Sequence, residues 1–284
     1  MKLIALPPVA LSVVFLLVSC ASPPEGGRVV REAGDPITFG IVDHVDSHVL
    51  RESRTLNILL PPSYVESKKT YPVIYLLDGA TNEDYHHVAG LVDFLTTYQL
   101  MPESILVGIA NTDRGRDFTH PSTNSEDKKA LPTGGGSAAF MDFLGSELQP
   151  YIQTHYRVGK RKMIIGQSLG GLLATEILLT RNRLFDTYII VSPSLWWADG
   201  ALVKGASDFS AADVDGRRTV ILSIGTEHPA MHEGMNALRA VLARAGDAID
   251  VTFMPLPEET HATILHRAIY RALEAIYGEA YPGL

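Results

Sequence analysis

The sequence predicts an α/β protein with a mostly parallel sheet of about eight strands and helices on both faces. Short apolar runs flanked by turn residues alternate along the chain with segments of helical periodicity, the order that builds such a sheet. In addition, the apolar run at 162–167 passes through the turn Gly-Gln-Ser-Leu-Gly at 166–170 straight into a helical pattern. A strand, a tight turn and a helix in immediate succession can hold a serine exposed at the apex of the turn.

The N-terminus predicts export. Lys2 precedes a run from 3 to 18 that is almost entirely apolar, which is typical of a secretory signal peptide over 1–19. The run ends in Leu-Val-Ser-Cys at 17–20, which resembles the bacterial lipobox, where the peptide is cut before the cysteine and the cysteine carries the lipid. The alternatives are a cytosolic protein with a chance apolar start and a transmembrane anchor. The run is short for a span, and its small-residue end suits cleavage.

Residues 20–35 predict a flexible tether between a membrane and the folded domain, because they are mostly small or polar and include several Gly and Pro. We expect Cys20 to carry the lipid. It is the only cysteine of the chain, so no internal disulfide can form. The expected location is a lipid-anchored state in the periplasm or at the outer membrane. Ala21, where an aspartate would stand for retention, favours the outer membrane by resemblance to enterobacterial sorting.

The rest of the chain, 36–284, predicts one domain. Its length of about 250 residues is within the range of one large domain, and a hydrophobic content of 46% in the chain is enough for one sizeable core. The net charge of −8 argues against non-specific binding to nucleic acids or anionic membranes through the folded surface.

The elements of this domain follow from the patterns in order. The first two strands, at 37–45 and 55–60, alternate polar and apolar residues with no helix between them, as in an antiparallel edge. The runs at 73–78 and 187–192 are almost continuously apolar, as in strands buried on both faces. The other strands are expected at 104–110, 162–167, 219–225 and 250–256, and the helices at 84–98, 137–154, 168–180, 231–245 and 262–276. Eight strands with the serine after the fifth is the order of the α/β-hydrolase fold.

Several segments together resemble the putative-esterase family of α/β-hydrolases, close to the enterochelin and ferric-siderophore esterases. They cover most of residues 37–280 and comprise the serine turn, Tyr-Pro-Val-Ile-Tyr-Leu-Leu-Asp-Gly at 71–79, Val-Gly-Ile-Ala-Asn-Thr-Asp-Arg at 107–114 and Ser-Pro-Ser-Leu-Trp-Trp at 192–197. The resemblance implies a cofactor-free serine esterase acting on a small-molecule ester, with an aromatic or siderophore ester as one candidate substrate. The family spans many substrates, and the fold alone does not fix the function.

Ser168 is the expected nucleophile at the apex of the turn. Gly166 and Gly170 remove the side chains that would collide in so tight a turn. The backbone N–H of Leu169 lies at the expected helix N-terminus, where partial positive charge favours an oxyanion. The second oxyanion donor is expected from the loop after the third strand, at the backbone N–H of Ala80.

The chain order of this fold, serine then acid then histidine, selects the other catalytic candidates. His261 follows the last strand and precedes the final helix, so it is the expected base. Glu227 follows the strand at 219–225 and is the expected acid that orients His261. Some siderophore esterases of the resembling family work with a serine–histidine dyad, which leaves the need for an acid open. The competing carboxylates, each expected to be a solvated charge, are Glu233, Glu258 and Glu259.

Two pairs of residues are candidates for holding the substrate. Arg114 and Arg116 follow the strand at 104–110 at its carboxyl end, where open α/β sheets bind ligands, and could hold an anionic group. The alternative is an internal Arg–Asp network that shapes the loop. Trp196 and Trp197 follow the sixth strand at the same edge and could stack on an aromatic acyl group, although at least one of them is expected in the core.

Metal chemistry is not expected. His228 and His232 are four residues apart, but Pro229 interrupts the first turn and no H-E-x-x-H motif occurs. Three rival functions stay open on the same scaffold: acyl transfer to an alcohol, hydrolysis of a sugar-linked acetyl or feruloyl ester, and non-catalytic binding. The last is disfavoured because serine, histidine and carboxylate all stand at their expected places.

Overall fold

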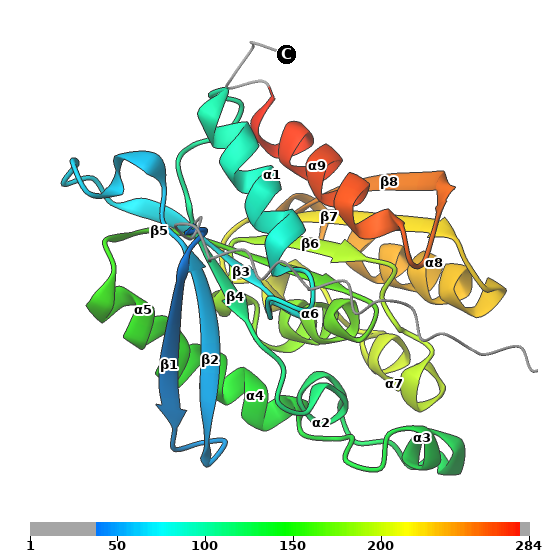
Figure 1. Cartoon of the computed structure of the whole chain (residues 1–284). Helices are drawn as coiled ribbons and strands as arrows, with labels where there is room; N and C mark the ends of the chain where they lie inside the picture. Colours follow the sequence, from blue (N-terminus) through cyan, green and yellow to red (C-terminus); the bar gives the residue numbers. More distant parts are fainter. Residues whose placement is uncertain (1–37, 279–284) are drawn as a thin grey trace, which may run out of the picture. The chain divides into compact units, whose positions relative to one another are not determined.

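The structure of the protein is a computed structural model that describes residues 38–278, so the predicted signal peptide, Cys20 and the predicted tether lie outside the described residues. The described strands form one sheet in the order β1-β2-β4-β3-β5-β6-β7-β8 (Figure 1). β1 and β2 are antiparallel to their neighbours and the remaining strands are parallel, which confirms the predicted antiparallel N-terminal edge. The strands are β1 (Ile41–Ser47), β2 (Glu52–Leu59), β3 (Tyr71–Leu76), β4 (Ile105–Ile109), β5 (Val158–Gln167), β6 (Thr187–Val191), β7 (Arg218–Thr226) and β8 (Ile249–Thr260).

Helices cover both faces of the sheet. The helices α1 and α9 lie together on one face, and α4 to α8 lie on the other (Figure 1). Their bounds are α1 (Tyr85–Thr97), α2 (Arg114–Phe118), α3 (Ser125–Ala130), α4 (Ser137–Phe143), α5 (Gln149–His155), α6 (Leu169–Thr180), α7 (Trp197–Gly205), α8 (Pro229–Ala243) and α9 (Ile264–Tyr277). Single 3₁₀ turns occur at Pro62–Tyr64, Asn182–Leu184, Ala211–Asp213 and Gly246–Ala248.

The central strands are apolar on both sides because each side faces a layer of helices. In β3, Ile74 and Leu76 pack under α1 and α9, whereas Val73 and Tyr75 point to the opposite core. This alternation follows from the two-residue period of a strand. It explains why the sequence shows continuous apolar runs there, as predicted for a parallel sheet.

The helix predicted over 137–154 is one helical path in three segments. A π-helical turn (Leu144–Leu148) separates α4 from α5. Pro150 stands in the first turn of α5 and has no N–H to donate to the preceding turn. The change in hydrogen-bond spacing at a π turn accommodates that missing donor.

The short helices α2, α3 and α7 have no counterpart among the predicted elements. The first turn of α7 is not regular, because Ala198, Asp199 and Gly200 all have positive φ, at 52°, 57° and 75°. Side chains of the α3 region hold this turn: Asp127 Oδ2 accepts from the backbone N–H of Ala198 at 2.9 Å, and Asn124 Nδ2 donates to Asp199 Oδ1 at 2.9 Å. A left-handed turn fixed by distant side chains carries no periodic signal, so the sequence did not reveal it.

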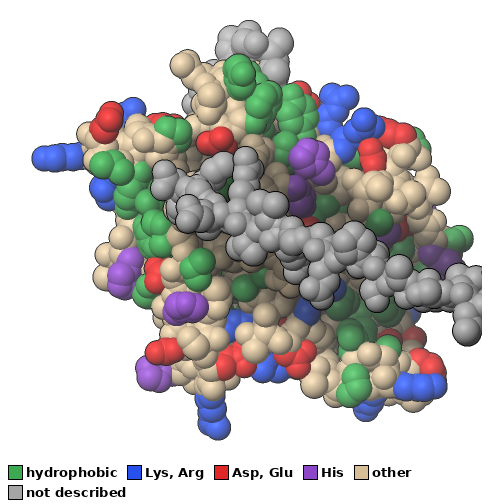
Figure 2. Space-filling view, viewed as in Figure 1, with side chains coloured by type: hydrophobic (Ala, Val, Ile, Leu, Met, Phe, Trp, Pro, Cys, Tyr) green, Lys and Arg blue, Asp and Glu red, His purple; other side chains and the backbone are tan. Residues whose placement is uncertain are grey.

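The described surface carries charges of both signs. In the space-filling view, acidic and basic side chains are interspersed rather than gathered into a field of one sign (Figure 2). Within residues 38–278, no helix is both long and apolar enough to cross a bilayer.

Candidate active site

Ser168 lies at the junction of β5 and α6 in a strained conformation. Its φ and ψ are 58° and −117°, and its backbone N–H donates to Val191 O at 3.1 Å. A β-carbon on Gly166 would lie 2.4 Å from the carbonyl oxygen of Gly170, so only glycine fits at 166. The turn predicted from the pentapeptide is therefore closed by glycine on the strand side, and the serine stands at its apex.

The two expected oxyanion donors differ in whether their N–H group already donates to a side chain. Leu169 is the first residue of α6, so its N–H belongs to the free N-terminal turn of that helix. The N–H of Ala80, in contrast, donates to Glu83 Oε2 at 2.9 Å. Gly79 brings this loop against β4, since a β-carbon there would lie 2.4 Å from Gly108 Cα. The Ala80 N–H lies on the expected loop, but it already donates a hydrogen bond to the Glu83 carboxylate of the same loop.

The sheet places the candidate acid and base side by side. Thr226 of β7 pairs with Thr260 of β8, after a register shift, and each is followed directly by a candidate residue. His261 Nδ1 lies 2.9 Å from Glu227 Oε2. The Glu227 side chain is 4% exposed and the His261 side chain 45%, so the acid is buried behind a base that reaches the surface. A carboxylate can only accept, so the imidazole donates from Nδ1 and keeps Nε2 as an acceptor.

Two further side chains that the sequence analysis did not single out hold this pair. Ser192, buried and at φ 42°, donates its hydroxyl to Glu227 Oε1 at 2.6 Å. Gln167 donates its side-chain amide to the carbonyl oxygen of His261 at 2.5 Å. Gln167, the residue before Ser168, therefore ties the loop of His261 to the serine turn. The signal for Ser192 was present in the Ser-Pro-Ser segment at 192–194, which was used only as part of the family resemblance.

Ser194 contacts the nucleophile itself. The Oγ atoms of Ser168 and Ser194 are 3.2 Å apart, and the N–H of Ser194 donates to Ser168 O at 3.0 Å. In this structure the nucleophile hydroxyl is thus engaged with a second, buried hydroxyl.

Arg114 lies beside the serine turn in a polar network. Its guanidinium binds Asp78 in a bidentate fashion, at 2.6 Å and 2.9 Å, and approaches Gln167 O at 3.4 Å. Asn111 Nδ2 donates to both Asp78 Oδ1 and Glu83 Oε1, at 2.6 Å and 2.8 Å. Burial raises the pKa of Asp78, and the Arg114 guanidinium opposes that rise. Asp78 is thus a structural hydrogen-bonding residue beside the serine turn.

Arg116 does not share this location. Its guanidinium is paired with Glu52 at 2.6 Å and with Asp117 at 2.7 Å, and both carboxylates also bind the fully buried Arg54. The donors of Arg116 are used in an internal Arg–carboxylate network that shapes the loop, which is the alternative that the sequence left open, and the structure gives no support to a substrate role.

The two tryptophans separate into a surface and a core residue. Trp196 is 43% exposed, whereas Trp197 is 2% exposed and donates its indole N–H to His120 O at 2.8 Å. A substrate role for Trp197 is therefore ruled out by packing, and Trp196 remains available at the surface.

The competing residues lie in other settings. Glu258 and Glu259 are paired with Arg267, and His228 caps α8 by accepting from Ala230 N at 3.3 Å. His266 lies on α9 next to His87. Within the part of the chain that the structure describes, no group of three His, Cys, Asp or Glu side chains is arranged to hold a metal ion.

Comparison with known proteins gives a consistent result. A family model described as "Putative esterase" matches residues 47–250. The chain is 31% identical over 252 residues to the ferri-bacillibactin esterase of Bacillus subtilis, covering 78% of this chain and 84% of that protein. It is 27% identical to the siderophore triacetylfusarinine C esterase of Aspergillus fumigatus, covering 68% and 74%. Among solved structures, an IroE-like serine hydrolase from Shewanella oneidensis superposes with a TM-score of 0.74 at 28% identity, covering 84% and 80%.

Proposed function

The chain belongs to the putative esterase family and is a carboxylic ester hydrolase of the serine type, and from this premise we propose that Ser168 is its nucleophile, His261 its base and Glu227 its acid. The observation that carries the proposal is the contact of 2.9 Å between His261 Nδ1 and Glu227 Oε2, at the end of two paired strands and tied to the serine turn through Gln167.

The reaction follows from this arrangement. Ser168 Oγ attacks the ester carbonyl carbon while His261 Nε2 takes the hydroxyl proton, and Glu227 stabilises the resulting imidazolium. The carbonyl oxygen becomes an oxyanion, which the N–H groups of Leu169 and Ala80 stabilise once Glu83 has left Ala80. The C–O bond to the alcohol then breaks, and His261 returns the proton to the leaving oxygen. Water, activated by His261, hydrolyses the acyl-enzyme and releases the acid.

The proposed substrate class is the siderophore ester. Two relatives that cover most of this chain are named for ferri-bacillibactin and for triacetylfusarinine C, both siderophores. Two features of the site suit a large polar ester with aromatic groups. Trp196 presents an exposed indole, and Arg114 keeps a guanidinium with a 37% exposed side chain beside the serine turn.

The proposed location is a membrane surface outside the cytoplasm, with the domain held by lipid on Cys20. The apolar run and the Leu-Val-Ser-Cys segment at 17–20 support it. An esterase in that compartment would meet siderophore esters as they enter the cell envelope.

The first prediction concerns the nucleophile. Ser168→Ala should lower kcat for an activated ester by roughly four to six orders of magnitude, because the attacking oxygen is lost while the fold is kept. The measurement is release of p-nitrophenol from the acetate ester, followed by hydrolysis of iron-loaded and iron-free trilactone siderophores. Ser146→Ala, at an exposed serine of the π turn, is the matched control and should behave as the wild type. A folded Ser168→Ala protein with wild-type turnover would refute the catalytic assignment.

A further inference from the structure

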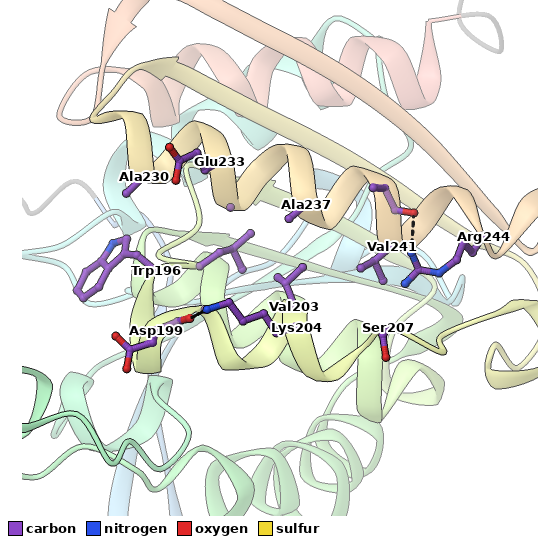
Figure 3. Close-up of a pocket in the computed structure, with 14 residues that line it drawn as sticks. Trp196, Asp199, Val203, Lys204, Ser207, Ala230, Glu233, Ala237, Val241 and Arg244 are labelled. Atoms are coloured by element: carbon purple, nitrogen blue, oxygen red, sulfur yellow. Dashed lines mark hydrogen bonds between the residues drawn. The ribbon is translucent and has the colours of Figure 1, made fainter.

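A groove of about 560 Å³ runs between α7 and α8 on one face of the molecule (Figure 3). None of the residues in the catalytic contacts described above lines this groove. Its two walls are the faces that these helices turn toward each other. The residues that shape it are Leu195, Trp196 and Val203 on one side and Ala230, Ala237 and Val241 on the other.

One end of the groove opens at the catalytic edge of the sheet. Both helices begin at that edge, since α7 follows β6 and α8 follows β7 two residues after Glu227. Trp196 and Ala230 lie together at this end (Figure 3). Leu195 directly follows Ser194, whose hydroxyl lies 3.2 Å from that of Ser168. The first residue of the groove wall is therefore the direct neighbour of Ser194, which contacts Ser168.

Much of the groove lining is apolar, and the charged residues Asp199, Lys204, Glu233 and Arg244 lie along it. Small residues on α8, at Ala230, Gly234 and Ala237, leave room where larger side chains would fill it. Gly234 is required for this geometry, because a β-carbon there would lie 2.8 Å from Leu195 Cβ. From Ala230 to the end of α8 the helix rises by roughly 20 Å, at about 1.5 Å per residue, so the groove is elongated.

The cations along the groove are already engaged by backbone carbonyls. Lys204 Nζ donates to Asp199 O, and Arg244 donates to Ala240 O at 3.2 Å and to Ala206 O at 2.8 Å. The Arg244 guanidinium thereby links the end of α8 to the end of α7 at the far end from Trp196 (Figure 3). The groove thus has one end at the catalytic edge of the sheet, beside Trp196, and is bounded by Arg244 at its other end.

We propose that this groove is the subsite for an elongated, uncharged apolar arm on the acyl side of the ester. The acyl group is the part that stays bonded to Ser168 Oγ in the acyl-enzyme, and the groove wall begins at Leu195, directly after Ser194, whose Oγ lies 3.2 Å from Ser168 Oγ. The leaving alcohol is on the side of His261, which protonates it. The inference rests on the proposed serine-esterase function and names the specificity of that same site.

The test varies the acyl chain at a constant leaving group. The probes are p-nitrophenyl acetate, butyrate, hexanoate and octanoate, below their micelle concentrations. In the wild type, kcat/KM should rise with chain length, with octanoate roughly ten-fold above acetate, because each added methylene is buried. Ala237→Phe places a ring in the middle of the groove at an exposed position and should lower the octanoate-to-acetate ratio roughly ten-fold.

Ala243→Phe is the matched control, because Ala243 is exposed on the same helix but does not line the groove. It should keep the wild-type ratio, and the thermal unfolding temperatures of both variants should stay close to that of the wild type. A wild type without chain-length preference would overturn the proposal, and so would an unchanged ratio in Ala237→Phe. If the wild type shows no Ser168-dependent hydrolysis of any of the four esters, acetate included, the esterase mechanism on which this proposal rests is refuted instead.

Discussion

At the scale of single residues, the carboxylate of Glu227 is fixed at both oxygens. Ser192 donates to Oε1 at 2.6 Å and His261 lies 2.9 Å from Oε2. Because the side chain is almost fully buried, water does not compete for either oxygen. Glu227 therefore offers Oε2 alone to His261 Nδ1, and in a fixed direction. Such an acceptor sets the tautomer and the ring orientation of a catalytic histidine.

From the contact between Ala80 and Glu83 we predict that removing the Glu83 side chain raises kcat/KM. In the proposed mechanism the oxyanion binds the Ala80 N–H, which in this structure donates to Glu83 Oε2 at 2.9 Å. Glu83→Ala should therefore raise kcat/KM for p-nitrophenyl acetate, by up to roughly ten-fold, because a larger fraction of the enzyme is ready to bind the oxyanion. Steady-state kinetics beside Glu66→Ala, an exposed glutamate, checks it. A fall in kcat/KM would show instead that Glu83 holds the loop in its active shape.

How far the sequence predicts the site depends on the kind of contact. The proximity of Glu227 and His261 follows from chain order, because both residues come directly after neighbouring parallel strands. The roles of Ser192 and Gln167 depend on side-chain directions in tight turns, for which no periodic pattern exists. The sequence predicted that at least one of the two tryptophans is buried but not which, because both have the same sequence context and only packing separates Trp197 from Trp196.

At the scale of elements, α1 and α9 connect the two sides of the site. The loop before α1 carries Ala80 and the loop before α9 carries His261. The helices meet through His87 and His266, whose Nδ1 atoms are 3.3 Å apart, while His87 Nε2 lies 3.2 Å from Asp84 Oδ1. A change in this contact would act on both loops.

This contact predicts a pH dependence of stability. Burial and the neighbouring His87 lower the pKa of His266. A base with a lowered folded pKa contributes its full stability above its unfolded pKa, about 6.5, and loses it as pH falls through the folded value. The unfolding temperature should thus fall between pH 7.5 and pH 5, and His266→Gln should reduce that fall by roughly a degree, a small effect because the histidine is partly solvated.

Calorimetry at both pH values measures the effect. His48→Gln, at an exposed histidine, is the control and should leave the pH dependence as in the wild type. An identical fall in wild type and His266→Gln would contradict the role given to this pair.

Regular elements were predicted well where a long periodic pattern exists. α6, α8 and α9 lie within two residues of their expected bounds. α8 and α9 each carry an apolar face against the sheet, whereas α6 is buried along nearly its whole length and is marked by its apolar run after the serine turn. The helices α2 and α3 have five and six residues, too few for a period to be recognised. Their stability comes from side-chain caps such as Asp113 and Asn124, together with contacts to distant loops.

At the scale of the whole molecule, the alternation of strands and helices predicted the α/β-hydrolase fold, and the sheet order confirms it. The relation of the domain to the membrane stays a prediction from the sequence, because Cys20 and the segment before it lie outside the described residues.

The anchor proposal makes a prediction for the full chain. Expressed in a bacterial host with radioactive palmitate, the wild type should be labelled and should fractionate with membranes. Cys20→Ser should lose the label and appear in the soluble fraction, because the cysteine that carries the lipid is gone. If Cys20→Ser stays in the membrane fraction, the apolar N-terminal run itself is the anchor and the lipoprotein proposal fails.

The distribution of strained backbone has a consequence for the evolution of the protein. Of the seven non-glycine residues at positive φ in the described chain, five lie at the catalytic edge of the sheet: Asp78, Ser168, Ser192, Ala198 and Asp199. Each such residue destabilises the fold by about 1–3 kcal/mol, and glycine would relieve much of that strain. A lineage released from selection for catalysis would gain stability by replacing these residues. The catalytic edge is therefore the part of the described fold where stability is given up for a defined backbone geometry.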